Sequence, residues 1–380
     1  MSNMPRQYFI GLMSGTSMDG LDAALVDFSG DRPRLIEAIK HPIPESLRAE
    51  LLALCQPGDN EIDRLGSADV ALGELFAEAT MRLLAQAGIE ARDITAIGSH
   101  GQTIRHRPEQ GFTLQIGDPN RIAQRTGITT VADFRRRDMA VGGQGAPLVP
   151  AFHASVFRLP DRNRVILNLG GMANITILPA DPLQAVSGFD TGPANVLLDH
   201  WAQRHLEQPC DMDGTWAASG QVNEGLLTTL LADSFFAKAP PKSTGRERFN
   251  AAWLTEKLAL SEHSLSPQDI QATLCELTAQ SAAEAIIRHV PGVHEVLVCG
   301  GGAHNRQLIA RLQARLSTLP VRSTDELGLP ADWIEAMAFA WLAGETLAGR
   351  EGNLAAVTGA SQAVVLGAIY PGAGPAGAKT

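Results

Sequence analysis

Two short apolar runs separated by a turn of small residues occur twice in this chain. Residues 9–28 (FIGLMSGTSMDGLDAALVDF) contain the first such unit, which ends at Ser29-Gly30. Short apolar runs bounded by turn residues predict strands, so this unit is predicted to be strand–turn–strand. Residues 165–178 (VILNLGGMANITIL) repeat the pattern. Two such units far apart in one chain predict an internal duplication, with one unit in each of two related domains.

The rest of the pattern alternates strands with helices. Residues 61–87 have apolar positions at helical spacing and are followed by Gly88, a residue typical of helix ends. A second helix is predicted to open at Asp118-Pro119 and to end at Gly127. Strands are predicted at residues 94–99, 113–117 and 128–134. This alternation indicates an α/β fold in which helices cover the sheets.

Length and composition agree with two domains. The chain has 380 residues, 44% of them hydrophobic, which is enough for two cores. The glycine-rich segment 142–147 (GGQGAP) is the expected junction. We therefore expect an N-terminal domain at 1–145, a C-terminal domain at 146–370 and a disordered tail at 371–380.

Charge and residue spacing exclude several classes of function. A net charge of −10 argues against a nucleic-acid surface, which needs a field of Lys and Arg. No apolar run is long enough to span a membrane and the N-terminus lacks a signal pattern, so we expect a cytoplasmic protein. The four cysteines have no C-x-x-C spacing and the ten histidines no H-E-x-x-H spacing. Neither a zinc site nor a disulfide framework is expected.

The first turn has the composition of a phosphate-binding loop. Gly15 and Gly20 allow the backbone to approach a phosphate closely, and main-chain N–H groups can donate to its oxygens. Hydroxyl donors are also present at Ser14, Thr16 and Ser17. The turn predicts that the chain binds a nucleotide.

This turn is not a P-loop. Leu21 and Asp22 stand where a P-loop has Lys and Ser or Thr. The alternative is an ordinary hairpin in which Asp19-Gly20 only makes the turn. The second copy of the pattern, with Gly170 and Gly171 at its turn, favours phosphate binding.

A third glycine-rich segment, residues 300–302, follows the apolar run 296–299 and precedes a helix that begins near Asn305. A nucleotide base or ribose can lie against such bare backbone, and close packing of a strand on a helix is the alternative. Two phosphate-type turns elsewhere in the chain favour the nucleotide.

Two carboxylates stand out as candidates for chemistry. Asp190 lies at an abrupt turn before a helix predicted at 194–206, where it is either an N-cap or, if Thr191 caps instead, free to face a cleft. Glu335 is the only acid in a nearly apolar helix predicted at 333–343. It either favours the positive end of the helix dipole or is satisfied by a ligand.

Several motifs resemble those of the anhydro-N-acetylmuramic acid kinases. Residues 11–22 (GLMSGTSMDGLD) are similar to the signature of that family. Further similar segments are 99–103 (SHGQT), 133–135 (DFR), 143–148 (GQGAPL), 168–174 (NLGGMAN), 189–193 (FDTGP) and 241–247 (PKSTGRE). The resemblance extends from about residue 10 to about residue 370, with no departure at a position needed for the family's chemistry.

The resemblance implies a fold and a cofactor. The family belongs to the superfamily of acetate kinase, sugar kinases, heat-shock chaperones and actin, whose two duplicated ribonuclease-H-like domains close on ATP around an interdomain cleft. It implies Mg²⁺ as a second cofactor, with the protein ligands of the metal unknown, and a homodimer. Contacts to the ATP phosphates are implied for Gly15, Thr16, Ser17, Met18, Asp19, Gly20, Leu21, Asp22, Gly170 and Gly171, and contacts to adenosine for Gly300, Gly301 and Gly302.

The resemblance also implies an unusual reaction, in which 1,6-anhydro-N-acetylmuramic acid is opened by water and phosphorylated on O6 to give N-acetylmuramate 6-phosphate and ADP. Such a reaction serves cell-wall recycling and amino-sugar catabolism. Asp190 is the implied base for the attacking water, and Glu335 would hold the same water or the sugar. Gln102 and Arg135 are candidates for binding the sugar, although an ion pair of Arg135 with Asp133 or Asp138 is the alternative.

Two other functions remain open at this stage. An ordinary amino-sugar kinase would use Asp190 to deprotonate a sugar hydroxyl directly. A non-catalytic module of the actin or chaperone type would use the same nucleotide clamp to change shape. Residue types alone do not decide which oxygen attacks the phosphate.

Overall fold

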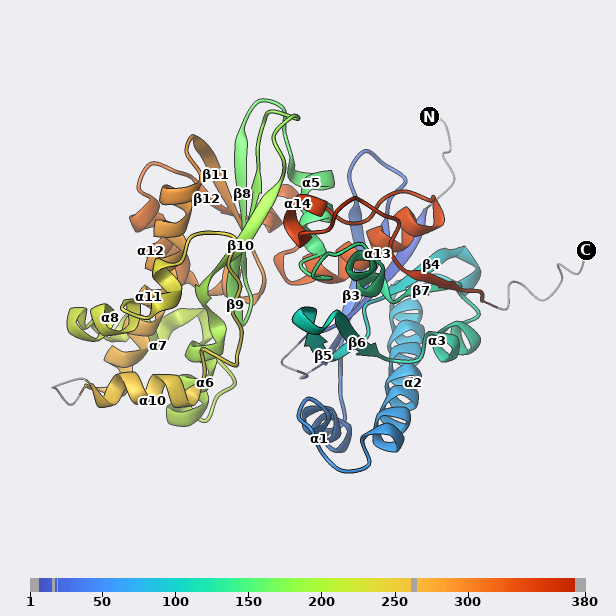
Figure 1. Ribbon diagram of the computed structural model, residues 1–380, viewed down its shortest axis with the longest axis horizontal. Coiled ribbons are helices and arrows are strands. Elements are labelled where there is room, and N and C mark those ends of the chain that lie inside the picture. The colour runs from blue at the N-terminus through green and yellow to red at the C-terminus, as the bar shows by residue number, and fades with distance from the viewer. Residues whose placement is uncertain (1–6, 16–17, 19, 261–264, 373–380) are drawn as a thin grey trace, which may run out of the picture. The chain divides into compact units, whose positions relative to one another are not determined.

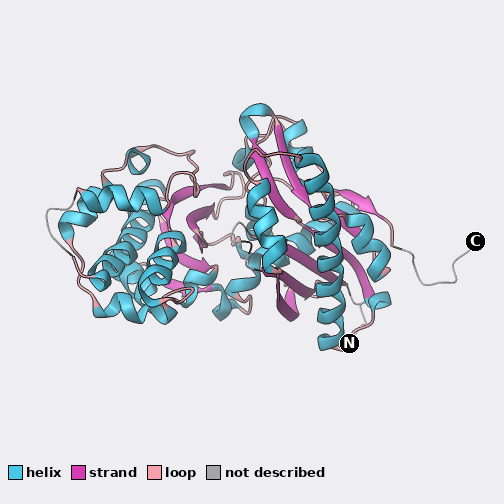
Figure 2. Cartoon of the chain, turned by 90° about the horizontal axis from the view of Figure 1, so that it is seen from below, coloured by secondary structure: helices cyan, strands magenta, loops and turns pink. Residues whose placement is uncertain are grey.

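The computed structural model describes residues 7–15, 18, 20–260 and 265–372. Its contacts divide the chain into two compact units, one made of residues 1–156 with 333–380 and the other of residues 157–332. Figure 2 shows that each unit combines a layer of strands with helices. The predicted α/β class is confirmed.

The first unit is built on a mixed six-stranded sheet. Strands β1 (Tyr8–Ser14), β2 (Gly20–Asp27) and β3 (Arg34–Pro42) form an antiparallel meander, so the first predicted strand–turn–strand unit is confirmed. Strand β4 (Ile94–Ser99) pairs parallel to β1, and β7 (Thr130–Ala132) pairs parallel to β4. With β13 (Ala368–Tyr370) at the edge, the order is β13-β7-β4-β1-β2-β3.

The second unit repeats this topology. Strands β8 (Asn163–Leu169), β9 (Met172–Leu178) and β10 (Ser187–Pro193) form another antiparallel meander. Strand β11 (Val293–Cys299) pairs parallel to β8, and β12 (Val321–Ser323) pairs parallel to β11. The order β10-β9-β8-β11-β12 matches the order β3-β2-β1-β4-β7 in the first sheet. The internal duplication into ribonuclease-H-like units is therefore confirmed.

Helices cover both sheets and enclose two separate cores. In the first unit, α2 (Glu61–Ala87) and α3 (Pro119–Thr126) lie side by side (Figure 1), and the hairpin of β5 (Gln102–Arg107) and β6 (Phe112–Ile116) follows β4. The second unit contains α11 (Pro267–His289), in which residues 270–283 are buried apart from the half-buried Gln280. The helices of the first unit are α1 (Glu45–Leu54), α2 (Glu61–Ala87), α3 (Pro119–Thr126), α4 (Phe134–Ala140), α5 (Val149–Phe157), α13 (Ile334–Leu347) and α14 (Ala355–Thr358). Those of the second are α6 (Asn195–Leu206), α7 (Thr215–Ser219), α8 (Glu224–Leu231), α9 (Ser234–Ala237), α10 (Ala251–Ala259), α11 (Pro267–His289) and α12 (Arg306–Leu316).

The boundaries of these units differ from the expected ones, because the chain returns to the first unit after residue 332. Helix α13 packs on β1 and β4. Gly11 and Gly98, which are paired across these strands, make room for it. A Cβ atom on Gly11 would lie 1.7 Å from the carbonyl oxygen of Ala336, and one on Gly98 would lie 2.0 Å from that of Phe339. The glycine-rich segment 142–147 thus lies inside the first unit.

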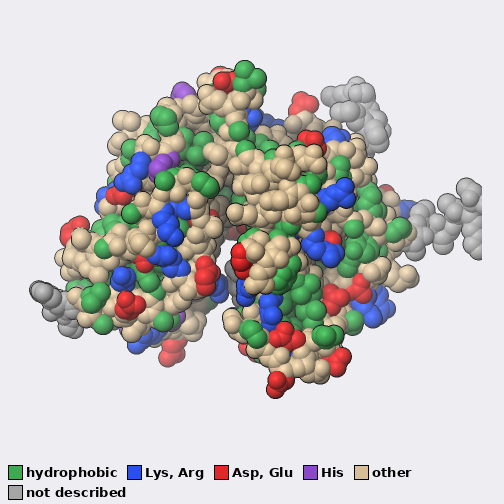
Figure 3. All heavy atoms as spheres, in the orientation of Figure 1, with side chains coloured by type: hydrophobic (Ala, Val, Ile, Leu, Met, Phe, Trp, Pro, Cys, Tyr) green, Lys and Arg blue, Asp and Glu red, His purple; other side chains and the backbone are tan. Residues whose placement is uncertain are grey.

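One local expectation is corrected, and a second falls largely outside the described residues. The strand expected at 128–134 is shorter, because Asp133 adopts a left-handed backbone with φ 60° and Phe134 already begins α4. The expected tail at 371–380 lies outside the described residues except for its first two positions. None of the helices in the described ranges combines the length and apolar character needed to cross a bilayer. Acidic and basic side chains are interspersed on the face shown in Figure 3.

Candidate functional site

The first predicted phosphate turn is only partly described. Thr16, Ser17 and Asp19 lie outside the described residues. Met18 and Leu21 have their side chains in the core of the first unit, so only their backbone groups can serve a ligand. The amide of Met18 donates to the carbonyl of Gly15 at 3.2 Å.

Gln102 supports the strand that leads into this turn. The hydroxyl of Ser14, at the end of β1, donates to Oε1 of Gln102 at 2.5 Å, and both residues are buried. The amide nitrogen of Gln102 donates to the carbonyl of Thr103 at 3.2 Å. Gln102 thus holds the end of β1 in place, which is a contact that the sequence did not indicate.

Arg135 binds a neutral histidine. Its Nε and Nη2 atoms lie 3.0 and 2.9 Å from Nε2 of His100, so this ring nitrogen is the acceptor. The tautomer that fits carries its proton on Nδ1, which donates to the carbonyl of Gly101 at 2.8 Å. Burial, and next the charge of Arg135, hold the pKa of His100 well below its ordinary value. His100 is therefore uncharged at neutral pH.

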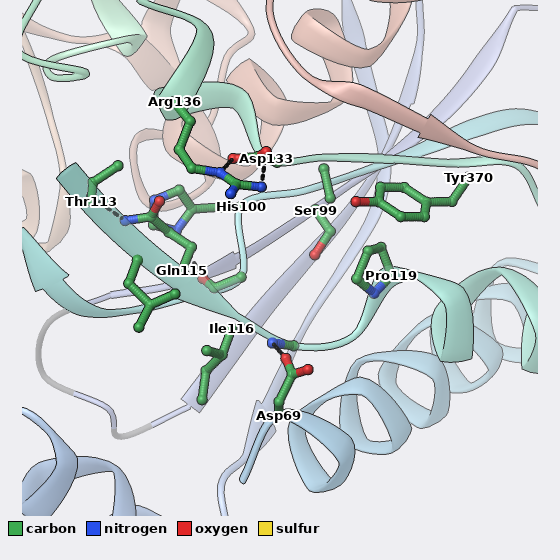
Figure 4. Close-up of a pocket in the computed structure, with 14 residues that line it drawn as sticks. Asp69, Ser99, His100, Thr113, Gln115, Ile116, Pro119, Asp133, Arg136 and Tyr370 are labelled. Atoms are coloured by element: carbon green, nitrogen blue, oxygen red, sulfur yellow. Dashed lines mark hydrogen bonds and ion pairs between the residues drawn. The ribbon is translucent and has the colours of Figure 1, made fainter. Parts of the chain in front are cut away.

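Arg135 remains a cation in spite of its burial. Burial lowers its pKa to about 10, while the negative charges of Glu335 and Asp138 oppose that shift. Its Nη1 donates to the carbonyl of Gly145 at 2.8 Å. Asp133 pairs with Arg136 instead (Figure 4), which removes one of the two expected partners of Arg135. In the folded chain, the negative charge of Glu335 therefore acts on the guanidinium of Arg135.

Asp138 organises the loop behind Arg135. Its fully buried carboxylate accepts hydrogen bonds from the amide of Gly145 at 2.8 Å, Nδ2 of Asn353 at 2.6 Å and the hydroxyl of Thr358 at 2.7 Å. These bonds tie the glycine-rich loop to the segment after α13. Sequence reasoning missed this role because Asn353 and Thr358 are more than 200 positions from Asp138.

In the second unit, Asp190 lies in the middle of β10, next to a register shift in its pairing with β9. Its Oδ2 accepts from the amide of Thr244 at 2.8 Å, and its own amide donates to the carbonyl of Lys242 at 3.0 Å. Burial raises the pKa of Asp190 to about 6, and nearby Glu247 adds to that shift, while the Thr244 amide and Lys242 oppose it. A pKa in this range suits a general base near neutral pH.

Asp190 is not a helix cap. The N-cap position of α6 is Ala194, and no side chain caps that helix. The expectation that Thr191 caps it is also wrong, because the hydroxyl of Thr191 donates to the carbonyl of Ala173 at 3.3 Å. Asp190 and Thr191 both lie within strand β10, so helix α6 begins only after them, at Asn195, one residue later than the sequence predicted.

The two glycines of the second predicted phosphate turn have free space beside their Cα atoms. The carbonyls of Gly170 and Gly171 accept hydrogen bonds of 3.0 to 3.1 Å from the amides of Ala194, Asn195 and Val196. A Cβ atom on Gly171 would meet nothing within 4 Å, and one on Gly170 would meet no atom closer than 3.7 Å. Packing of the described chain does not require these glycines, so their bare backbone is free to approach a ligand.

The third glycine segment lies directly against this turn. A Cβ atom on Gly300 would lie 2.5 Å from Oδ1 of Asn168, and one on Gly302 would lie 2.6 Å from Cβ of Leu169. Close packing therefore accounts for these two glycines. Only Gly301 is open, since its nearest neighbour would be 3.9 Å away.

The comparison with known proteins decides the family. The chain matches the family described as anhydro-N-acetylmuramic acid kinase over residues 7–372. A protein of that name from Shewanella halifaxensis (strain HAW-EB4) is 54% identical over 371 residues, which cover 97% of this chain and 100% of the relative. This chain belongs to the anhydro-N-acetylmuramic acid kinase family. A family member from Coxiella burnetii (strain Dugway 5J108-111) is 53% identical and is covered to 99%, with 97% of this chain.

The likeness to solved structures is weaker than that to the kinase family. Component A of the (R)-2-hydroxyglutaryl-CoA dehydratase from Acidaminococcus fermentans is 11% identical, with a TM-score of 0.47. The match covers 88% of this chain and 96% of that one.

For this family member, the expected site residues fall into two sets. The first unit holds the first turn, Gln102, Arg135 and Glu335, and the second holds Asp190 with the other two glycine segments. His100 and Thr244 were missed, although both lie within the motifs 99–103 and 241–247 that carried the resemblance. In the described residues, no three His, Cys, Asp or Glu side chains gather to bind a metal ion.

Proposed function

We propose that this protein is an ATP-dependent anhydro-N-acetylmuramic acid kinase that converts 1,6-anhydro-N-acetylmuramic acid, water and ATP into N-acetylmuramate 6-phosphate and ADP. The match to the kinase family over residues 7–372 supports the substrate. The observation that carries the mechanism is the half-buried carboxylate of Asp190, whose pKa is raised to about 6 by burial. At neutral pH most of it is ionised and ready to accept a proton.

The ether bond of the substrate determines which bonds must form and break. O6 of the anhydro-sugar is an ether oxygen bound to C1. It carries no proton that a base could remove, so it cannot attack ATP as a deprotonated hydroxyl. Asp190 takes a proton from water as the water oxygen attacks C1, in the manner of an inverting glycosidase. The C1–O6 bond breaks, O6 forms a bond to the γ-phosphorus of ATP, and ADP leaves. The phosphoryl group thus replaces the acid that normally traps the departing oxygen.

Glu335 and Arg135 are proposed to bind the sugar. Glu335 lies in the first turn of α13, where its charge acts on Arg135. Arg135 donates to His100 and Gly145 through three of its nitrogen atoms, and a guanidinium carries five N–H donors. Donors therefore remain for the lactyl carboxylate of the substrate. Gln102 is proposed to act indirectly, by holding Ser14 at the end of β1.

The glycine segments are proposed to bind ATP. The open backbone at Gly170 and Gly171 supports contact with the phosphates, together with the turn that follows Ser14. Of the segment 300–302, Gly301 has the free space to face adenosine. Mg²⁺ usually keeps several waters and binds nucleotide phosphates with one or two protein carboxylates, so the absence of a three-carboxylate cluster in the described ranges is compatible with it. The ion would offset charge on the phosphates.

An isotope experiment tests this reaction. The enzyme is incubated with Mg-ATP and the anhydro-sugar in ¹⁸O-labelled water, and the 6-phosphorylated product is analysed for the position of the label. Label in the hydroxyl on C1 is expected. Turnover of free N-acetylmuramate without turnover of the anhydro form would instead identify an ordinary amino-sugar kinase, in which Asp190 deprotonates a hydroxyl.

We also propose that the enzyme works in the cytoplasm as a homodimer, a state that the family resemblance suggests. Light scattering coupled to size-exclusion chromatography measures the mass directly. A mass of one chain at micromolar concentration would contradict the dimer.

A further inference from the structure

The first unit contains a small pocket that the proposed reaction does not use. Its walls come from α2, the ends of β4 and β7, strand β6, the start of α3 and strand β13 (Figure 4). The pocket encloses about 180 Å³. This is less than the 300–1,000 Å³ typical of sites for drug-sized ligands, so it suits one small ring or a fragment of similar size.

Two hydroxyl groups in this pocket lack a hydrogen-bond partner among the described residues, and a carboxylate beside them accepts from a backbone amide. The hydroxyl of Ser99 is buried and has no hydrogen-bond partner among the described residues. Tyr370 points its hydroxyl toward Ser99 (Figure 4), and that hydroxyl makes no hydrogen bond within the described chain. Asp69 accepts from the amide of Gly117 at 2.6 Å but forms no ion pair there. An unpaired buried hydroxyl costs free energy that a bound ligand can recover.

The charges around the pocket disfavour an anion. Burial raises the pKa of Asp69, which indicates that its charge is poorly solvated. Burial also raises the pKa of Tyr370, and the charge of Asp133 adds to that effect. The one cation lining the pocket, Arg136, is already engaged by Asp133. A negatively charged ligand would therefore meet Asp69 without a free counter-charge.

Part of the remaining lining is apolar, although the polar side chains of Thr113 and Gln115 also line the pocket. Ile116 and Pro119 form part of the wall, together with the ring of Tyr370. An apolar face beside a carboxylate and two hydroxyls matches a ligand that has a C–H face and several O–H donors. Asp69 accepts from such donors, while Ser99 and Tyr370 can each donate or accept.

We propose that this pocket is a second binding site, for a compact neutral ligand with several hydroxyl groups, of the size of one pyranose ring. It is separate from the proposed kinase reaction and does not depend on it. The pocket nevertheless borders the end of β4 and the start of α4, the segments next to His100 and Arg135. Ser99 directly precedes His100, and Asp133 and Arg136 flank Arg135. A ligand there would contact both segments that hold Arg135 against His100.

The test measures binding of glucose and glucuronate to the full chain without ATP. These two probes share a pyranose ring and differ in charge. In a ¹⁵N-labelled sample, glucose is expected to shift the amide signals of Gly101 and Gly117, which line the pocket, while glucuronate shifts them at least about fivefold less at equal concentration.

Two variants and a control locate the site. Tyr370→Phe keeps the ring and Ser99→Ala removes an unsatisfied hydroxyl, so both are expected to fold, and each is expected to raise the dissociation constant for glucose about fivefold or more. Ser219→Ala is the matched control in the second unit, where the hydroxyl donates to the carbonyl of Trp216, and it is expected to change nothing. Unfolding temperatures confirm that the variants are folded.

Three results would overturn the proposal. The first is no shift of these amides up to about 100 mM glucose, which lies beyond the millimolar range of weak specific sites. The second is equal binding by the folded Tyr370→Phe and Ser99→Ala variants, which would place glucose elsewhere. The third is equally tight binding of glucuronate, which would refute the neutral class of ligand. None of these results bears on the kinase reaction, because no turnover is measured.

Discussion

At the scale of single residues, the chemistry of this protein depends on charges whose environment is set by distant segments. Asp190 owes its raised pKa to burial and its orientation to the amide of Thr244, 54 positions away. His100 is neutral because it is buried beside Arg135. Opposite shifts of this kind allow one group to accept a proton at neutral pH while another acts only through hydrogen bonds.

Replacement of the proposed base tests its role. Asp190→Asn keeps an oxygen for the Thr244 amide but cannot take a proton, so kcat is expected to fall at least about a hundredfold while ATP binding is retained. Steady-state kinetics with the anhydro-sugar and a separate nucleotide-binding measurement check this. Asp213→Asn, an exposed acid in the same unit, is the control and should leave kcat unchanged. Near-normal turnover by Asp190→Asn would remove Asp190 from the base role.

The pH dependence of activity follows from the same carboxylate. Asp190 must be ionised to act as a base, so kcat/KM is expected to decline with unit slope as the pH falls through about 6. The rate profile of the wild-type enzyme between about pH 5 and pH 8 measures this limb. A profile that stays flat through this range would contradict the assignment.

The raised pKa also has a cost in stability. Its folded value of about 6 lies above the ordinary 3.8, so the folded state binds more protons between these values and its free energy of unfolding decreases as the pH rises through that window. Asp190→Asn removes this penalty. Its Tm is therefore expected to equal or exceed that of the wild type at about pH 8, with a smaller advantage at about pH 4. Thermal denaturation at both pH values tests it, and a Tm clearly below the wild type at the higher pH would refute it.

At the scale of elements, close approach of α13 to the first sheet positions Glu335. The paired glycines Gly11 and Gly98 let the backbone of the helix contact the strands directly. The pattern of the sequence predicted a helix near residues 333–343, and α13 (Ile334–Leu347) confirms it. Its location on β1 and β4 was not predictable, because an apolar helix can pack on any apolar face and the glycines that select this one are over 230 positions away.

A single methyl group tests this packing. Gly98→Ala would place Cβ 2.0 Å from the carbonyl oxygen of Phe339, so α13 must shift, and the free energy of unfolding is expected to fall by about 1–3 kcal/mol or more. Gly66→Ala in α2 is the matched control, since its Cβ would meet nothing within 4 Å. It is expected to stabilise the helix by about 0.5–1 kcal/mol. Urea denaturation measures both, and equal stability of the two variants would contradict the packing argument.

At the scale of the whole molecule, the chain leaves the first unit at residue 156 and returns to it at residue 333. The second unit is one continuous segment with its own sheet and its own core, whereas the first unit needs two segments. This arrangement predicts different behaviour for the two when they are separated.

Fragments of the chain test the division. Residues 157–332 are expected to fold alone and to unfold cooperatively, because their core is complete. Residues 1–156 are expected to be unstable alone, because they lack α13 and β13, and to gain structure when 333–380 are co-expressed. Circular dichroism and thermal denaturation of each fragment measure this. A cooperative transition of 1–156 by itself would show that the two segments are not one folding unit.

The sequence by itself determined the duplicated strand–turn–strand units, the α/β class and, through its motifs, the family. These are local properties, since strand periodicity and turn glycines depend on neighbours along the chain. Only the tertiary structure decided that Gly300 and Gly302 are needed for packing while Gly301 is open, and that Asp190 is a buried carboxylate of raised pKa rather than a helix cap. It also returned residues 333–372 to the first unit. The reason is that burial and close approach depend on segments far apart in sequence, which no local pattern encodes.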